Sequence, residues 1–167
     1  MIRSAMATVV LVTAATPALA DLPAACTQAP TFAAALAQLE AGGWQTQPRD
    51  ATFTQAQTDA LAWTLMTRYV GTDTGGEEIA TLLDLQRAAV PGLLARVDGD
   101  TTLSRVLLNG DDALTITQTR TAPGRIERSC RLASAGPAPA GLDLIDTSGI
   151  EGAPATLAET LTILPEE

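Results

Sequence analysis

The chain contains no histidine and no lysine, and it has only two cysteines and few aromatic side chains. Without histidine, serine–histidine–aspartate triads, cysteine–histidine pairs and most catalytic zinc sites are excluded. The glycine patterns of P-loops and Rossmann folds are also absent. The scarcity of aromatics argues against stacking platforms for bases or sugars. We therefore predict no catalytic site, no metal and no cofactor.

Positive charge is scarce, because ten arginines face nineteen acidic residues and the formal net charge is −9. An acidic chain is repelled by nucleic acid and by anionic lipid surfaces, so we exclude both as partners. No apolar run reaches the ~20 residues that a transmembrane helix requires. We therefore expect no membrane span in the mature chain.

The N-terminus, MIRSAMATVVLVTAATPALAD, has the layout of a secretory signal peptide. Arg3 supplies the positive charge, residues 5–15 form an apolar core, Pro17 breaks a helix, and Ala18-Leu19-Ala20 is a small-x-small cleavage site. We predict that residues 1–20 are removed before Asp21. The mature protein is then expected in the periplasm or outside the cell.

Residues 21–167 suit one domain, mainly helical over 21–98 and mainly strand over 99–167. Apolar residues at helical spacing predict helices in PTFAAALAQLEAGGW, TFTQAQTDALAWTLMTRYVG and GGEEIATLLDLQRAAVPGLLARVDG. Thr54 and Gln57 fit a capping box at the start of the second helix. Pro91 is expected to break or kink the third helix.

After Gly99 the apolar pattern changes to a period of two, which is typical of strands. Asn109-Gly110 and Pro123-Gly124 divide this stretch into three antiparallel strands joined by tight turns. LDLID and ATLAETLTIL add one or two further strands. We predict an α+β fold in which N-terminal helices pack on one face of an antiparallel sheet of three to five strands.

The cysteines, Cys26 and Cys130, are far apart in the sequence. Two thiolates without histidine lack the four ligands of a structural zinc site, and a cysteine nucleophile would lack its imidazole base. In an oxidising compartment, a disulfide is the simplest use of such a pair. Cys130 also shares the inward strand face with Ile126 and Leu132. We predict one disulfide within the domain, between Cys26 and Cys130.

Several short acidic motifs carry carboxylates of the kind that catalytic or metal sites use. TDTGG and LIDTSG resemble Asp-Thr-Gly loops, but the first lacks a preceding apolar strand and the second has Ser148 in place of glycine. VDGDTT and NGDDA fit solvated turns better than a pair of acids set across a cleft or a calcium loop. Trp44 and Trp63 are expected to be packing residues.

Residues 103–133 are net positive within this acidic chain, with five arginines against three acids. If Leu114, Ile116 and Cys130 face the helices, the opposite sheet face carries a set of polar and charged side chains. Its members are Thr115, Thr117, Thr119, Arg125, Glu127 and Arg131. We predict that Thr115, Thr117, Thr119, Arg125 and Arg131 form a partner-binding face, with an ordinary solvated sheet face as the alternative.

Two function classes remain open. The favoured one is a non-enzymatic exported binding or accessory domain, whose partner is an envelope protein or a small anionic ligand. The alternative is a small hydrolase that uses carboxylates only. A deep pocket with two convergent acids would favour the hydrolase, and a shallow cavity beside a polar face would favour binding.

Overall fold

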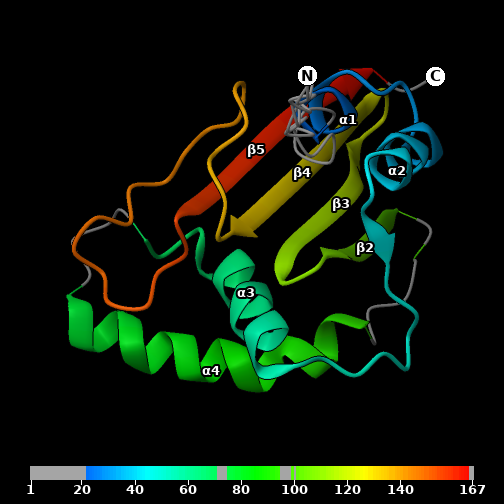
Figure 1. Cartoon of the computed structure of the whole chain (residues 1–167). Coiled ribbons are helices and arrows are strands. Elements are labelled where there is room, and N and C mark those ends of the chain that lie inside the picture. Colours follow the sequence, from blue (N-terminus) through cyan, green and yellow to red (C-terminus); the bar gives the residue numbers. More distant parts are fainter. Residues whose placement is uncertain (1–21, 71–74, 95–98, 100, 166–167) are drawn as a thin grey trace, which may run out of the picture.

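The computed structural model describes residues 22–70, 75–94, 99 and 101–165. The predicted signal peptide (1–20) and Asp73 of the TDTGG motif fall outside this range. In chain order the elements are α1 (Leu22–Thr27), α2 (Phe32–Ala41), β1 (Gln45–Thr46), α3 (Gln55–Met66), α4 (Gly76–Leu94), β2 (Thr102–Asn109), β3 (Asp112–Ala122), β4 (Arg125–Ser134) and β5 (Thr156–Pro165). The predicted α+β class, antiparallel sheet and single disulfide are confirmed (Figure 1).

The strands form one antiparallel sheet in the order β1-β2-β3-β4-β5 (Figure 1). The two predicted hairpins are present, with Asn109 paired to Asp112 and Ala122 paired to Arg125. Gly110 and Gly124 have φ values of 63° and 74°, a backbone region in which side chains are strained, so glycine suits both turns. ATLAETLTIL forms β5, whereas LDLID contributes only a bridge between Leu144 and Ala158.

Helices cover both faces of the sheet, although we predicted that they share one face. One core cluster joins α1 and α2 to Leu107, Leu114, Ile116, Cys130, Leu132 and Ala158. The other joins α3 and α4 to Val106, Leu108, Ala113, Ala133 and Leu157. The reason lies in strands that carry consecutive apolar residues, such as Val106, Leu107 and Leu108 in β2, because successive side chains point to opposite faces and both need cover.

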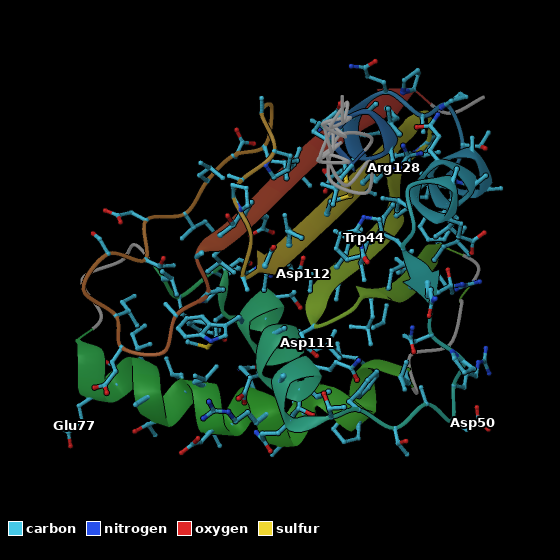
Figure 2. All side chains as sticks on the ribbon, in the orientation of Figure 1. Trp44, Asp50, Glu77, Asp111, Asp112 and Arg128 are labelled. Atoms are coloured by element: carbon cyan, nitrogen blue, oxygen red, sulfur yellow. A yellow bond between two sulfur atoms is a disulfide. The ribbon has the colours of Figure 1, made fainter. Side chains whose placement is uncertain are left out.

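The short helix α1 is attached to β4 in two ways. The predicted disulfide joins Cys26 of α1 to Cys130, across a sequence separation of 104 residues. Arg128, which is fully buried, donates from Nη1 to the carbonyl oxygens of Ala29 at 2.7 Å and Ala25 at 3.3 Å (Figure 2). Burial lowers the pKa of this guanidinium. Together these contacts fix α1 over the sheet.

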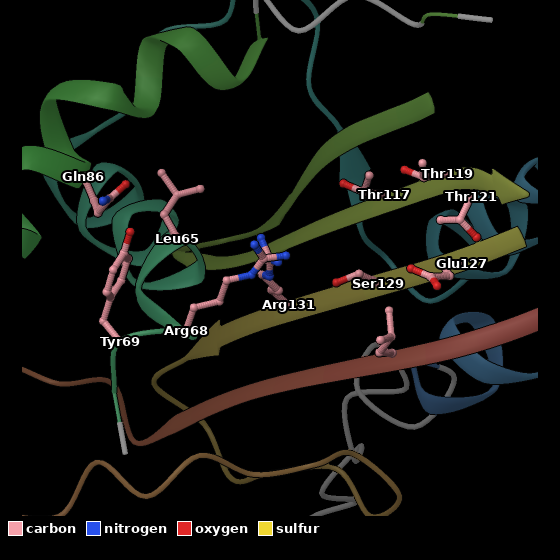
Figure 3. A pocket seen from close by; sticks show the side chains of 11 residues that line it. Leu65, Arg68, Tyr69, Gln86, Thr117, Thr119, Thr121, Glu127, Ser129 and Arg131 are labelled. Atoms are coloured by element: carbon pink, nitrogen blue, oxygen red, sulfur yellow. The ribbon is translucent and has the colours of Figure 1, made fainter. Parts of the chain in front are cut away.

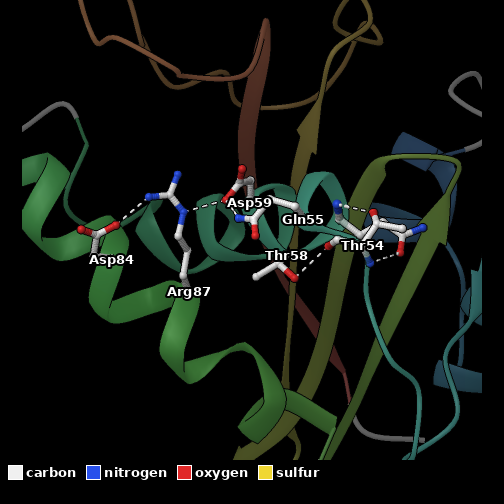
Figure 4. A network of polar contacts seen from close by, with 7 residues as sticks. Thr54, Gln55, Thr58, Asp59, Asp84 and Arg87 are labelled. Carbon is white, nitrogen blue, oxygen red and sulfur yellow. Dashed lines mark hydrogen bonds and ion pairs between the residues drawn. The ribbon is translucent and has the colours of Figure 1, made fainter.

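The helices α3 and α4 are joined by a polar network around Arg87 (Figure 4). Arg87 Nε lies 2.6 Å from Asp59 Oδ1 of α3, and its Nη1 lies 2.7 Å from Asp84 Oδ1 of α4. The hydrogen bond to Asp59 is the main cause that raises the pKa of Arg87. The capping box of Thr54 and Gln57 is confirmed at the start of α3.

The helix α4 includes Pro91 and runs on to Leu94, so Pro91 does not break the helix. Its 19 residues carry buried apolar side chains on one side and exposed charges at the start, Glu77 and Glu78. Within the described ranges, no helix is both long and apolar enough to cross a membrane.

Candidate functional site

A cleft of about 460 Å³ opens over the part of the sheet that α3 and α4 leave uncovered on their own side (Figure 3). We call it the threonine cleft. Its helical wall consists of Leu65, Arg68, Tyr69 and Gln86. Its sheet floor consists of Thr117, Thr119, Thr121, Glu127, Ser129, Arg131 and Leu161. The site therefore combines hydroxyl groups, two arginines and a small apolar margin.

The cross-strand register explains why the floor is polar. Side chains that share one face lie in rows across β2, β3, β4 and β5. Starting beneath α3, the rows are Leu108-Ala113-Ala133-Leu157, then Val106-Thr115-Arg131-Glu159, then Ser104-Thr117-Ser129-Leu161, then Thr102-Thr119-Glu127-Ile163. The row that packs against α3 is apolar, and the polar rows follow where helical cover ends.

The five residues of the predicted binding face do not all reach this cleft. Thr117, Thr119 and Arg131 line it. Thr115 is buried, with 8% of its surface exposed. Arg125 lies outside the lining, and its Nη2 is 2.9 Å from Glu127 Oε1. The structure thus brings three of the five together and separates the other two.

Sequence reasoning missed the helical wall of the cleft. The predicted helix TFTQAQTDALAWTLMTRYVG includes Tyr69, but α3 ends at Met66 and Tyr69 is 41% exposed. Arg68 follows the same helix end and is exposed. The available signal was Arg68 itself, a charge immediately after an apolar helical pattern, but its position over the sheet depends on tertiary packing.

Two arginines meet a carboxylate at the edge of the cleft nearest α3. Arg131 Nε lies 2.9 Å from Glu159 Oε1, with 18% and 24% of the two side chains exposed. In Figure 3 the guanidinium groups of Arg68 and Arg131 extend toward one another from the helix end and from β4. Here two positive charges adjoin one negative charge, which leaves the local charge positive.

The carboxyl of Glu159 titrates below its usual pKa. Burial raises this pKa, but the hydroxyl of Thr67, the hydrogen bond from Arg131 and the positive charges of Arg131 and Arg68 together lower it by more. The hydroxyl of Thr67 lowers the pKa of Glu159 without reaching the geometry of a full hydrogen bond. The net effect is a pKa below the usual 4.5.

This shift predicts an acid-sensitive contribution to stability. Because the folded state has the lower pKa, the contribution of Glu159 is present above pH 4.5 and is lost as the pH falls through the folded value. We expect Glu159→Gln to unfold more easily at pH 7 and to show a shallower decline in the free energy of unfolding below about pH 5. Urea denaturation at several pH values measures both. Equal pH slopes for the two proteins would contradict the assignment.

One hydroxyl of the floor has no partner. Ser129 Oγ is buried and makes no hydrogen bond in the described structure. By contrast, neighbouring hydroxyls on the same face bond to one another: Ser104 Oγ lies 3.1 Å from Thr117 Oγ1, and Thr102 Oγ1 lies 3.3 Å from Thr119 Oγ1. A buried hydroxyl without a partner costs free energy, and binding sites are one place where such a group is retained.

The acidic motifs adopt structural roles where the structure describes them. Asp112, labelled in Figure 2, accepts a hydrogen bond from the amide of Ala135 at 3.0 Å. Asp146 of LIDTSG accepts from the amide of Ser148 at 2.8 Å, and this hydrogen bond lowers the pKa of the exposed carboxyl. Among the residues described, no three or more histidine, cysteine or acidic side chains gather to hold a metal ion.

Comparison with known proteins finds no matching family model, curated protein or solved structure.

Proposed function

We propose that this protein is an exported, non-enzymatic binding protein that holds a small anionic ligand in the threonine cleft. The observation that carries the proposal is the convergence of Arg68 and Arg131 over a hydroxyl-lined floor. Guanidinium groups match the planar oxygens of carboxylates and phosphates, and hydroxyl groups can orient the remaining polar atoms of a ligand.

The size of the cleft supports a small ligand. Its volume of about 460 Å³ lies within the range of small-molecule sites. Leu65, Tyr69 and Leu161 provide apolar surface at its margins. The arrangement suits a molecule with an anionic group near the arginines and a compact body over Thr117 and Ser129.

The carboxylates near the cleft favour binding over hydrolysis. Glu127 is 2.9 Å from Arg125, and Glu159 is 2.9 Å from Arg131. A glycosidase-like mechanism needs one acid that can donate a proton and a second acid set across the substrate. Both carboxylates here are neutralised by arginines, and the pKa of Glu159 is lowered rather than raised. The hydrolase alternative therefore has less support.

Export is the part of the proposal that depends on the N-terminal sequence. A signal-like segment precedes the domain, and disulfides such as Cys26–Cys130 persist in oxidising compartments. Both observations support a periplasmic or secreted location.

The proposal predicts that Arg68 contributes to anion binding. We expect Arg68→Gln to weaken the binding of succinate, citrate or inorganic phosphate by about tenfold or more, because a charge-assisted hydrogen bond contributes about 1.5–3 kcal/mol. Isothermal titration calorimetry of the mature chain measures this change. Arg49→Gln is the matched control, since Arg49 is also exposed and lies outside the cleft. Failure of all three anions to bind at millimolar concentration, or equal loss in both variants, would overturn the proposal.

A second pair of variants tests the unpartnered hydroxyl of the floor. Ser129→Ala should leave the ligand-free protein as stable as the wild type or slightly more stable, and it should weaken anion binding. Thr160→Val is the control, because Thr160 Oγ1 is also buried without a partner but its side chain points to the opposite face of the sheet. Thr160→Val should change stability in the same direction and leave binding unaffected.

A further inference from the structure

The outer edge of β5 lacks a strand partner over its second half. Near its start, Leu157 accepts from the amide of Ile145 at 2.9 Å, and the amide of Glu159 donates to Asp143 at 3.1 Å. Backbone groups that point to one edge recur at every second residue of a strand, so those of Leu161 and Ile163 point to this edge too. In the described structure neither residue has a backbone partner there.

The open edge also carries exposed apolar side chains. Leu161 is 61% exposed and Ile163 is 58% exposed, and both lie on the face that bears the threonine cleft. Soluble proteins usually protect such an edge with charges, prolines or a covering element. Around Leu161 and Ile163, β5 has no charged side chain between Glu159 and Pro165.

We propose that a second copy of this chain pairs with the open edge, β5 against β5 in antiparallel orientation, about a two-fold axis through Thr162. In this register Leu161 of each copy lies opposite Ile163 of the other, and both residues have outward-pointing backbone groups. The two pairs can therefore exchange both of their backbone hydrogen bonds. Thr162 faces its own equivalent in a pair without hydrogen bonds.

The residues at the two ends of this register limit how far the strand pairing extends. Pro165 has no amide hydrogen to donate, and the edge position opposite Glu159 is already taken by Asp143, whose carbonyl accepts the Glu159 amide. The hydrogen-bonded pairing therefore involves Leu161 and Ile163 of each copy and ends before Glu159 and Pro165.

The pairing brings four apolar side chains, Leu161 and Ile163 of each copy, onto one surface. Since Leu161 lines the threonine cleft, Ile163 of the second copy would border the same cleft. The two binding sites would then lie beside each other on one continuous sheet. The open edge of β5 is present without a ligand, so the strand pairing requires none.

Sedimentation equilibrium of the mature chain tests the pairing. We expect a monomer–dimer equilibrium that Ile163→Lys weakens by at least about tenfold, since lysine at an edge opposes strand pairing. Leu85→Lys is the matched control, because Leu85 is 60% exposed on α4, and it should dimerise like the wild type. Dimerisation should strengthen as salt rises, because two acidic copies repel each other. A wild-type monomer at all concentrations and salt levels would overturn the proposal.

A cysteine crosslink tests the register itself. In a central pair without hydrogen bonds the Cα atoms are about 4.5 Å apart, within the range of a disulfide. Thr162→Cys should therefore form covalent dimers on mild oxidation. Leu164→Cys should not, because Leu164 and its equivalent would be about 14 Å apart along the strands. Non-reducing electrophoresis reads both results, and equal crosslinking of the two variants would contradict the register.

Discussion

Replacing both Cys26 and Cys130 with alanine is expected to lower the free energy of unfolding by about 4–5 kcal/mol. The bond closes a loop of 104 residues, and in the chain-entropy model a loop of this length restricts the unfolded state by about that amount. Both cysteines are buried, so alanine avoids placing a new polar group in the core. A loss of this size is a large fraction of the stability of an ordinary domain.

Urea denaturation of the oxidised wild type and the double variant measures the difference. Reduction of the wild-type disulfide should produce a similar loss, which separates the effect of the crosslink from that of the substitutions. Hydrogen exchange should show the largest local effect in α1, which the disulfide attaches to β4. A loss below about 1 kcal/mol would contradict a stabilising role for the disulfide.

Arg128→Met is expected to cost about 2–4 kcal/mol. Arg128 is fully buried, and its guanidinium donates to Gln118 Oε1 from Nε at 3.1 Å and from Nη2 at 2.8 Å. It also satisfies the carbonyl oxygens of Ala25 and Ala29. Methionine can occupy much of the apolar space, but it leaves these acceptors without donors in a buried setting.

Matched variants separate hydrogen bonding from charge. Arg128→Lys should also destabilise, because one ammonium group cannot reproduce the planar fork that reaches Gln118 and α1 at once. Arg49→Met should change stability by less than about 0.5 kcal/mol, since Arg49 is exposed. If Arg128→Met were as stable as the wild type, the contacts of Arg128 with α1 would not matter for folding.

Local signals in the sequence predicted much of the fold. The capping box at Thr54, the turns at Gly110 and Gly124, and the pairing of Cys26 with Cys130 each follow from neighbouring residues or from elimination. Such features depend on short-range chemistry, so one sequence is enough to recognise them.

The arrangement of layers was harder to predict. The only sequence signal for helices on both sheet faces was the run of consecutive apolar residues in β2, such as Val106 and Leu107. A short apolar run of this kind is ambiguous, because periodicity alone does not distinguish a strand buried on both faces from a buried helical segment. The two-residue strand β1 and the six-residue helix α1 are too short to produce a clear period. Tertiary contacts, rather than local propensity, establish both elements.

The candidate site was predictable on its sheet side only. Thr117, Thr119 and Arg131 follow from the alternation of β3 and β4, whereas Arg68 and Tyr69 enter the cleft because of how α3 crosses the sheet. Thr115 shares the alternation but lies closer to α3, and it is buried. Alternation assigns a residue to a face, but it does not predict which part of that face a helix covers.

Chemical-shift mapping of the ¹⁵N-labelled mature chain during titration with succinate tests the binding proposal most directly. We expect the perturbed amides to gather around Thr117, Thr119, Ser129 and Arg131 on the sheet and around Arg68 just after α3. We also expect Arg68→Gln to reduce these shifts greatly at the same succinate concentration. Perturbations located away from the threonine cleft, or equal shifts in the wild type and in Arg68→Gln, would contradict it.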